Sequence, residues 1–316
     1  MKTTLWSTLL ILNAHLGLVL AADATARPPL KARSYPSVTV GLSERHARGA
    51  TKPMMDFIGR ALDYPLRYDV EHSEAVVASG PEALMAFGKK LDSGEVHVGT
   101  MWGIEFGWLR QRYPELRPLA LCLYGDKGGI NSQMMVRNAF SGKKVDDLRG
   151  KILATYGRVT LMDKLFLNKT LDQLGETPAT FFSDIRECKS VRDAVQAVNR
   201  GDADCVLLSA MAYSYHVANQ PKIALRPLFA SPAFAVVVNV GRPSTIEKLS
   251  PGLWRRAQEV MLQVHRSAEG KQCMQFWRLA RFGKPDRAFE ALVQRNVADY
   301  PISVLGRLNE APTAPK

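Results

Sequence analysis

The clearest hydrophobic pattern in the chain lies between residues 148 and 208. A short apolar run at 151–156 is broken at Gly157, and from Thr160 onward apolar residues recur at helical spacing. A run of strand length followed by a period near 3.6 residues predicts a strand, a tight loop and a helix.

The same pattern then occurs a second time. Ser190 is a typical N-cap, Gly201 is a typical C-cap, and an apolar run at 205–208 predicts the next buried strand. Two successive βα units predict a parallel sheet. Helix N-termini at the carboxyl ends of such strands present unpaired N–H groups, so we expect a ligand near 155–160 and 187–192.

Shorter patterns of both kinds occupy the rest of the chain, and their alternation predicts an α/β fold. The expected strands are 38–42, 66–70, 96–99, 119–124, 133–136, 225–229 and 235–240. The expected helices are 53–62, 81–91, a segment ending near 113, 210–218 and 253–265, with a polar turn at 43–49.

Two segments, DLRGKILA and SVRDAVQAVNRGDADC, carry a family resemblance. Together with the intervening loop that opens a helix, they resemble the second lobe of periplasmic phosphonate-binding-type proteins, which serve ABC importers. The ending A-V-x-x-G-x-A-D is the most specific part, and the resemblance covers roughly residues 38–264.

This resemblance implies a type II periplasmic-binding-protein clamshell, in which each lobe is a mixed sheet flanked by helices and two crossover hinges join the lobes. It implies a periplasmic solute-binding protein that delivers a small-molecule ligand to a membrane transporter permease. The expected organisation is a signal peptide at 1–22, a linker at 23–37, a first lobe at 38–126 plus 230–310, a second lobe at 127–229 and a loose tail at 311–316.

The beginning of the chain fits export. Lys2 precedes a mostly apolar stretch at 5–20, and small residues follow at the expected cleavage site. A transmembrane anchor is the alternative, but the stretch is short and Ser7, Asn13 and His15 interrupt it. We therefore expect a secreted protein in the periplasm, without a lipid anchor because no cysteine follows the apolar stretch.

Composition narrows the possible partners. The chain has 316 residues, of which 46% are hydrophobic and 23% charged, so a globular protein is expected. Its formal net charge of +12 favours anionic partners such as a membrane surface, an acidic transporter face or an anionic solute. The basic residues are scattered and match no nucleic-acid motif, so we expect no nucleic-acid partner, and we expect a monomer.

No catalytic or metal-binding motif is apparent. The four cysteines form no C-x-x-C pair, so a metal site has no support, and their disulfide pairing is left open. The sequence contains no G-x-S-x-G, no H-E-x-x-H and no P-loop. We expect no enzyme activity and no cofactor, unless His, Ser and Glu side chains meet by chance in the cleft.

In a clamshell, the ligand lies between the facing strand ends of the two lobes. The candidate ligand-binding residues on the first lobe are Ser43, His46, His72, Trp102, Glu105 and Tyr124. On the second lobe they are Thr155, Tyr156, Arg158, Thr160, Ser190 and Arg192. The histidines can equally be solvated loop residues, and the tryptophan can be part of the core.

The sequence departs from the family at the expected anion site. Relatives have S-T-S-G at one helix start and Ser-His-Asp at the next, whereas this chain has YGRVT at 156–160 and Ser190, Val191 and Arg192. Either Arg158 or Arg192 is able to replace the lost donor, because an arginine fork binds phosphonate through two hydrogen bonds.

The chemistry of the first lobe leaves the ligand open. A Glu105 carboxylate facing the cleft would repel an oxyanion, and the neighbouring Trp, Met and Phe residues suit an apolar molecule. The ligand is therefore a phosphonate- or phosphite-type oxyanion, as the resemblance implies, or a largely apolar hydroxylated lipid or sterol-like molecule. A ligand-sensing subunit of a signalling system is a further alternative.

Overall fold

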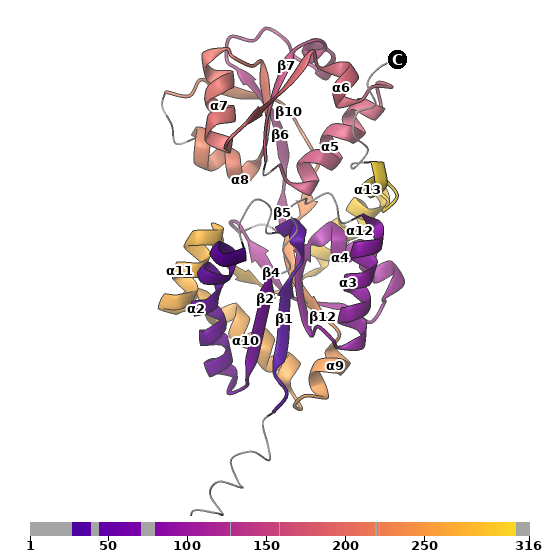
Figure 1. The fold of residues 1–316 in the computed structure, drawn as a ribbon, viewed down its shortest axis with the longest axis vertical. Coiled ribbons are helices and arrows are strands. Elements are labelled where there is room, and N and C mark those ends of the chain that lie inside the picture. Colours follow the sequence, from indigo (N-terminus) through magenta and orange to yellow (C-terminus); the bar gives the residue numbers. More distant parts are fainter. Residues whose placement is uncertain are drawn as a thin grey trace, which may run out of the picture.

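The computed structural model describes residues 27–38, 44–70, 80–126, 128–157, 159–218, 220 and 222–307. Two lobes lie one above the other, and each contains a sheet between helices (Figure 1). The signal peptide expected at 1–22 and the tail expected at 311–316 lie outside the described residues. No described helix is both long enough and apolar enough to span a membrane.

The first lobe is built on a mixed sheet with the strand order β13-β4-β12-β3-β1-β2. Its strands are β1 (Leu30–Ser34), β2 (Leu66–Val70), β3 (Val98–Trp102), β4 (Arg117–Leu123), β12 (Val237–Gly241) and β13 (Arg281–Gly283). β1 runs parallel to β2 and β3, whereas β12 runs antiparallel to β3 and β4. The sheet is mixed because β12 reaches it only after the chain has returned from the second lobe.

Helices cover both faces of this sheet. Figure 1 shows one group on one side, comprising α2 (Glu44–Leu62), α10 (Leu253–Gln263) and α11 (Ala268–Trp277). The group on the other side comprises α3 (Pro81–Ser93), α4 (Gly103–Arg112) and α12 (Arg287–Asp299). The shorter elements of this lobe are η1 (Pro36–Val38), α9 (Pro243–Glu247), η4 (Val264–Arg266) and α13 (Val304–Arg307).

The second lobe has a smaller mixed sheet with the order β10-β6-β9-β7-β8. Its strands are β6 (Ser132–Arg137), β7 (Ile152–Tyr156), β8 (Asp184–Cys188), β9 (Cys205–Ser209) and β10 (Leu225–Ala230). Its helices are η2 (Val145–Leu148), α5 (Leu161–Asp172), α6 (Pro178–Phe181), α7 (Val191–Arg200), α8 (Ala210–Tyr213) and the π-helical η3 (Ser214–Ala218).

The two crossover segments pair with each other between the lobes. β5 (Gly129–Ile130) and β11 (Phe234–Ala235) form a two-stranded antiparallel ribbon. Asn296 of α12 supports it: its side-chain oxygen accepts a hydrogen bond from Ala235 N at 2.7 Å, and its amide donates to Ala233 O at 3.0 Å. The predicted clamshell with two crossover hinges is therefore confirmed.

The βα units expected from the hydrophobic pattern are also confirmed. Thr160 caps α5, Ser190 caps α7, and Gly201 ends α7 in the left-handed conformation with φ +87°. β7 and β9 run parallel, as two consecutive βα units require. These local signals were strong because cap residues and apolar periodicity agreed with each other.

The beginning of the first lobe was predicted wrongly. β1 lies at Leu30–Ser34, inside the segment expected to be a linker. A strand was expected at 38–42, but Val38 belongs to the 3-10 helix η1. Residues 39–42 lie outside the described chain. Lys31 and Arg33 interrupt the apolar pattern of β1, so the sequence did not predict this strand. It forms because it pairs on both sides, with β2 and with β3.

The expected turn at 43–49 and the expected helix start at Pro53 are wrong as well. α2 is already helical at Glu44, and Pro53 lies inside it. A proline inside a helix removes one hydrogen bond, so local propensity favoured a start at Pro53. Packing of α2 on α10 and α11 outweighs that cost.

Each lobe fixes the start of a central helix with a buried carboxylate. Glu105 is 2% exposed, and its Oε2 accepts hydrogen bonds from Trp102 N at 2.9 Å and from the Ser37 hydroxyl at 2.8 Å. Asp163 is fully buried; its Oδ1 accepts from the Ser132 hydroxyl at 2.5 Å, and its Oδ2 accepts from the Thr160 hydroxyl at 2.7 Å. Both carboxylates therefore tie a strand-to-helix loop to a neighbouring segment.

Burial raises the pKa of both carboxyl groups, and it raises that of Glu105 to about 7 from an ordinary value of 4.5. A folded-state pKa above the unfolded value means that the folded protein binds the extra proton, so stability is lost as pH rises from about 4.5 to about 7. Replacement by Gln keeps an acceptor and removes this charge.

We expect Glu105→Gln to gain stability relative to the wild type as pH rises through this window, by at most about 3 kcal/mol. Urea unfolding of both proteins at pH 4.5, 6 and 7.5 measures the difference. A stability difference that stays constant with pH would show that folding does not shift the pKa of Glu105.

We expect Gly201→Ala to destabilise the protein by about 1 to 2 kcal/mol, because an alanine Cβ is strained in the left-handed conformation at φ +87°. Gly157→Ala is the matched control, since no atom lies within 4 Å of a Cβ at Gly157 and its φ is not positive. Equal thermal midpoints for the two variants would contradict the expectation.

Candidate functional site in the cleft between the lobes

A cavity of about 650 Å³ lies between the lobes at the hinge. Residues of the first lobe, the crossover and the second lobe all contribute to its wall: Tyr124, Gly125, Asp126, Gly129, Ile130, Asn131, Ala210, Met211, Ser214 and Arg278. Its size is within the usual range for small-molecule sites, which is about 300–1,000 Å³. The carboxyl end of β4 and the start of α8 meet here.

Hydrogen bonds fix the floor of this cleft. Asn131 accepts from Ala210 N through its backbone oxygen at 2.7 Å, and its side-chain amide donates to Ser231 O at 2.7 Å. Ser231 bonds in turn to Ser132 through both backbone and side chain. Asn131 therefore links one crossover to the other and also to the start of α8.

Arg278 belongs to the first-lobe wall of the cleft and has an unusual backbone. It ends α11 in the left-handed conformation with φ +57°, which is uncommon for a residue with a side chain. The neighbouring turn is held by a hydrogen bond from Leu279 N to Met274 O at 2.8 Å. Such strained residues concentrate at functional sites.

Arg278 and Arg192 both act electrostatically on one histidine of the second lobe. The pKa of His216, on η3 of the second lobe, is lowered first by burial and then by the charges of Arg278 and Arg192. Both guanidinium groups therefore lie within electrostatic reach of one imidazole. The one carboxylate in the described wall, Asp126, forms an ion pair with Arg281 at 3.5 Å.

Not all the candidate residues of the first lobe lie in the cleft wall. Tyr124 lies in the cleft wall, and His46 is exposed on α2. Trp102 is 5% exposed and donates from Nε1 to Ser37 O at 3.3 Å, beside the buried Glu105. Ser43 and His72 lie outside the described residues. The structure therefore places Trp102 and Glu105 in the interior of the lobe, because the capping bonds of α4 draw both inward.

The described candidates of the second lobe lie at two helix starts and on β7, outside the cavity wall given above. Thr160 and Ser190 are N-caps, and Arg192 is exposed in the first turn of α7. Thr155 is half-buried on β7, and Tyr156 is buried and donates to Leu207 O at 3.3 Å. Arg158 lies outside the described residues.

Sequence reasoning missed several residues of the cleft wall, of which Arg278 and Asn131 are the most informative. α11 ends without a glycine, and an arginine holds the left-handed position where glycine is usual. The lack of a glycine after α11 was the signal in the sequence that could have pointed to Arg278. Asn131 gave none, because its role depends on pairing between distant crossovers.

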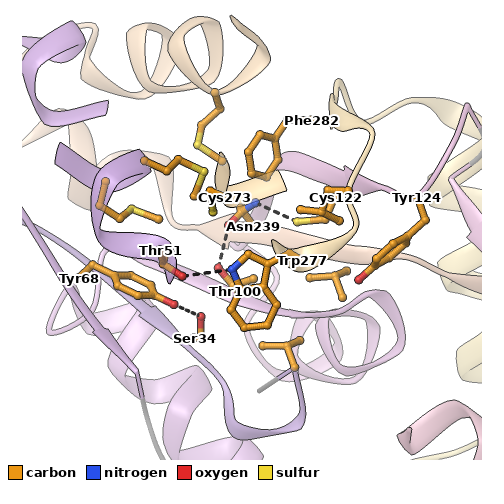
Figure 2. Close-up of a pocket in the computed structure, with 16 residues that line it drawn as sticks. Ser34, Thr51, Tyr68, Thr100, Cys122, Tyr124, Asn239, Cys273, Trp277 and Phe282 are labelled. Carbon is orange, nitrogen blue, oxygen red and sulfur yellow. Dashed lines mark hydrogen bonds between the residues drawn. The ribbon is translucent and has the colours of Figure 1, made fainter. Parts of the chain in front are cut away.

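A second, smaller cavity of about 80 Å³ lies inside the first lobe and shares Tyr124 with the cleft (Figure 2). We call it the chamber. It lies between the sheet and helices α2, α10 and α11, and it is lined by Ser34, Val38, Thr51, Met54, Met55, Tyr68, Thr100, Cys122, Tyr124, Val237, Asn239, Met261, Cys273, Trp277, Leu279 and Phe282.

The cysteine and metal chemistry is simple. All four cysteines lie in the described part of the chain, and none forms a disulfide. Among the described residues, no group of three or more His, Cys, Asp or Glu side chains is arranged to hold a metal ion.

Solved structures share this architecture. XAC2383 from Xanthomonas citri, bound to ATP, aligns with a TM-score of 0.62 at 16% identity over 90% of this chain and 100% of that one. PhnD1 from Prochlorococcus marinus, in complex with methylphosphonate, aligns with a TM-score of 0.59 at 14% identity over 85% of this chain and 97% of that one. These similarities establish the fold.

The sequence comparison establishes the family. No curated protein matches the chain as a relative. The family model described as "ABC transporter, phosphonate, periplasmic substrate-binding protein" matches residues 38–288. The chain therefore belongs to the phosphonate-type family of periplasmic substrate-binding proteins of ABC transporters.

Proposed function

We propose that this protein binds a phosphorus oxyanion, of the phosphonate or phosphite type, in the cleft and delivers it to the permease of an ABC transporter. The observation that carries the proposal is the position of Arg278, from the first lobe, in the cleft wall. It is supported by the charges of Arg278 and of Arg192, from the second lobe, which both act on His216. A guanidinium group binds a phosphonate through two parallel hydrogen bonds, and two such groups balance a dianion.

The position of the charges on opposite lobes also provides a mechanism for closure. A ligand held by both lobes gains more contacts when the cleft closes, so binding favours the closed state. The short β5–β11 ribbon is the natural hinge, because only two residue pairs connect its strands. Closure would remove the ligand from water and present a changed surface to the permease.

The burial of Glu105 supports an anionic ligand. Its carboxylate bonds to Ser37 and Trp102 inside the first lobe, so it does not repel an oxyanion in the cleft. The alternative of a largely apolar hydroxylated ligand rested on that repulsion and on the neighbouring Met101, Trp102 and Phe106, which are also buried in the lobe. The ligands bound in two structural neighbours, ATP and methylphosphonate, both contain phosphorus oxyanions, which supports the same class.

Arginine is needed here because the helix starts are already occupied. Asp163 accepts from Thr160 at the start of α5, and Asp193 accepts from the Ser190 hydroxyl at 2.9 Å at the start of α7. A carboxylate at a helix N-terminus uses the positive end of the dipole that would otherwise attract a ligand anion. The anion site therefore shifts from backbone N–H groups to guanidinium groups.

The remaining parts of the proposal follow from the family. The protein is exported to the periplasm by its N-terminal signal peptide, acts as a monomer and carries out no catalysis. The absence of a recognised catalytic motif in the sequence supports the last point.

We expect Arg278→Ala to weaken methylphosphonate or phosphite binding by about 10- to 150-fold, because a hydrogen bond to a charged group contributes about 1.5–3 kcal/mol. Titration calorimetry of the mature protein measures this loss. Arg255→Ala is the matched control, since Arg255 is exposed on α10 and pairs only with Glu259 four residues away among its described ion-pair partners.

Binding that is unchanged in both Arg278→Ala and Arg192→Ala would contradict the proposed anion site. Binding lost equally in Arg255→Ala would assign the effect to net charge instead of to the cleft.

A further inference from the structure

We propose that the chamber in the first lobe receives the organic substituent of the ligand, so that the ligand class is a phosphonate with an apolar alkyl or aryl group of several carbon atoms. This inference rests on the proposed function, which puts the anionic head in the cleft. It adds a second subsite and a preference that an inorganic oxyanion or methylphosphonate cannot exploit.

The chamber is next to the cleft along a single stretch of chain. Trp277 and Leu279 line the chamber, whereas Arg278 between them lines the cleft. Arg278 has a left-handed backbone, and its two neighbours line the other cavity. A ligand head on Arg278 therefore has its substituent close to residues that line the chamber.

Tyr124 is the second point of contact, because it belongs to both walls. It directly follows β4, and Figure 2 shows its ring at one end of the chamber, with Trp277 in the middle of the view. Burial raises the pKa of Tyr124 well above its ordinary value, so its hydroxyl remains a neutral hydrogen-bond donor. A neutral donor at the junction suits a molecule whose one end is anionic and whose other end is apolar.

The polar groups in the chamber wall bond to one another. The Ser34 and Tyr68 hydroxyls lie 2.7 Å apart, and Thr100 donates to Asn239 Oδ1 at 2.8 Å. Trp277 Nε1 donates to Thr51 Oγ1 at 3.2 Å (Figure 2). A buried water needs two to four polar partners, and these polar groups already bond to one another. An apolar group is therefore a better occupant than water.

The wall also carries no charge. Among the described residues that line the chamber, none has an acidic or basic side chain. Burial raises the pKa of the Cys122 and Cys273 thiols to about 12 each, so both stay protonated and behave as small apolar groups. Three methionines, Met54, Met55 and Met261, supply flexible side chains that adapt to substituents of different shape.

The volume limits the size of the substituent. A cavity of about 80 Å³ holds about five to eight water-sized groups, since one such group needs about 10–15 Å³ measured in the same way. The lower end of this range predicts that a substituent of about five carbon atoms fills the chamber.

The test is a homologous series of methyl-, propyl-, pentyl- and decylphosphonate, titrated into the mature full-length protein. Affinity should rise about fourfold per methylene up to about five carbons and then level off, because each buried methylene contributes about 0.8 kcal/mol. Equal affinity for all four compounds would overturn this inference and leave the proposed function standing. A failure of every phosphonate to bind would overturn the proposed function itself.

Variants assign the effect to the chamber. Leu279→Phe fills it and should reduce the advantage of pentylphosphonate over methylphosphonate by at least tenfold. Met55→Ala enlarges it and should move the plateau to a longer chain. Both positions are half-buried, so both changes are compatible with folding.

Leu174→Phe is the matched control, because Leu174 is 36% exposed in the second lobe, away from the chamber. It should keep the wild-type dependence on chain length. A dependence that persists unchanged in Leu279→Phe and Met55→Ala would place the substituent elsewhere and overturn the inference.

Discussion

The pairing of β5 with β11 is the interaction on which the rest of this structure depends. The chain crosses between the lobes twice, and backbone groups at a crossing must find partners or remain in water. The two crossovers solve this by bonding to each other, with Asn296 of α12 satisfying groups on β11 from the side. The ribbon therefore joins the lobes beside the cleft, and contacts of Lys169 on α5 with Asp299 and Tyr300 join them at a second place.

The electrostatics of the cleft follow from how each lobe begins its helices. Buried or capping carboxylates already occupy the starts of α5 and α7, because Asp163 and Asp193 complete the caps that Thr160 and Ser190 begin. The dipoles of those helices thus stabilise the protein's own side chains. Arg278 lies in the cleft wall on the first lobe, Arg192 lies at the start of α7 on the second lobe, and the charges of both act on His216. Under the proposed function, positive charges on both lobes would favour closure of the cleft around an anion.

The first lobe combines two environments within a few residues. α11 ends so that Trp277 and Leu279 belong to an apolar chamber and Arg278 to a charged cleft. The chamber wall contains several polar side chains, yet they pair with one another and present little to an occupant. The number of polar residues in a cavity therefore says less about its ligand than the partners that those residues already have.

The sequence by itself determined the fold class and most central elements, because caps, glycines and apolar periodicity agreed locally. The family resemblance added the clamshell and its two crossovers. Helix α7, from the Ser190 cap to Gly201, was predicted correctly for this reason. Only the tertiary structure decided that Leu30–Ser34 is a strand, since its partners β2 and β3 lie far along the chain. It also decided that Glu105 is buried in the lobe and that Arg278 faces the cleft. Which way a side chain points depends on packing and on hydrogen-bond partners distant in sequence, and no local pattern records either.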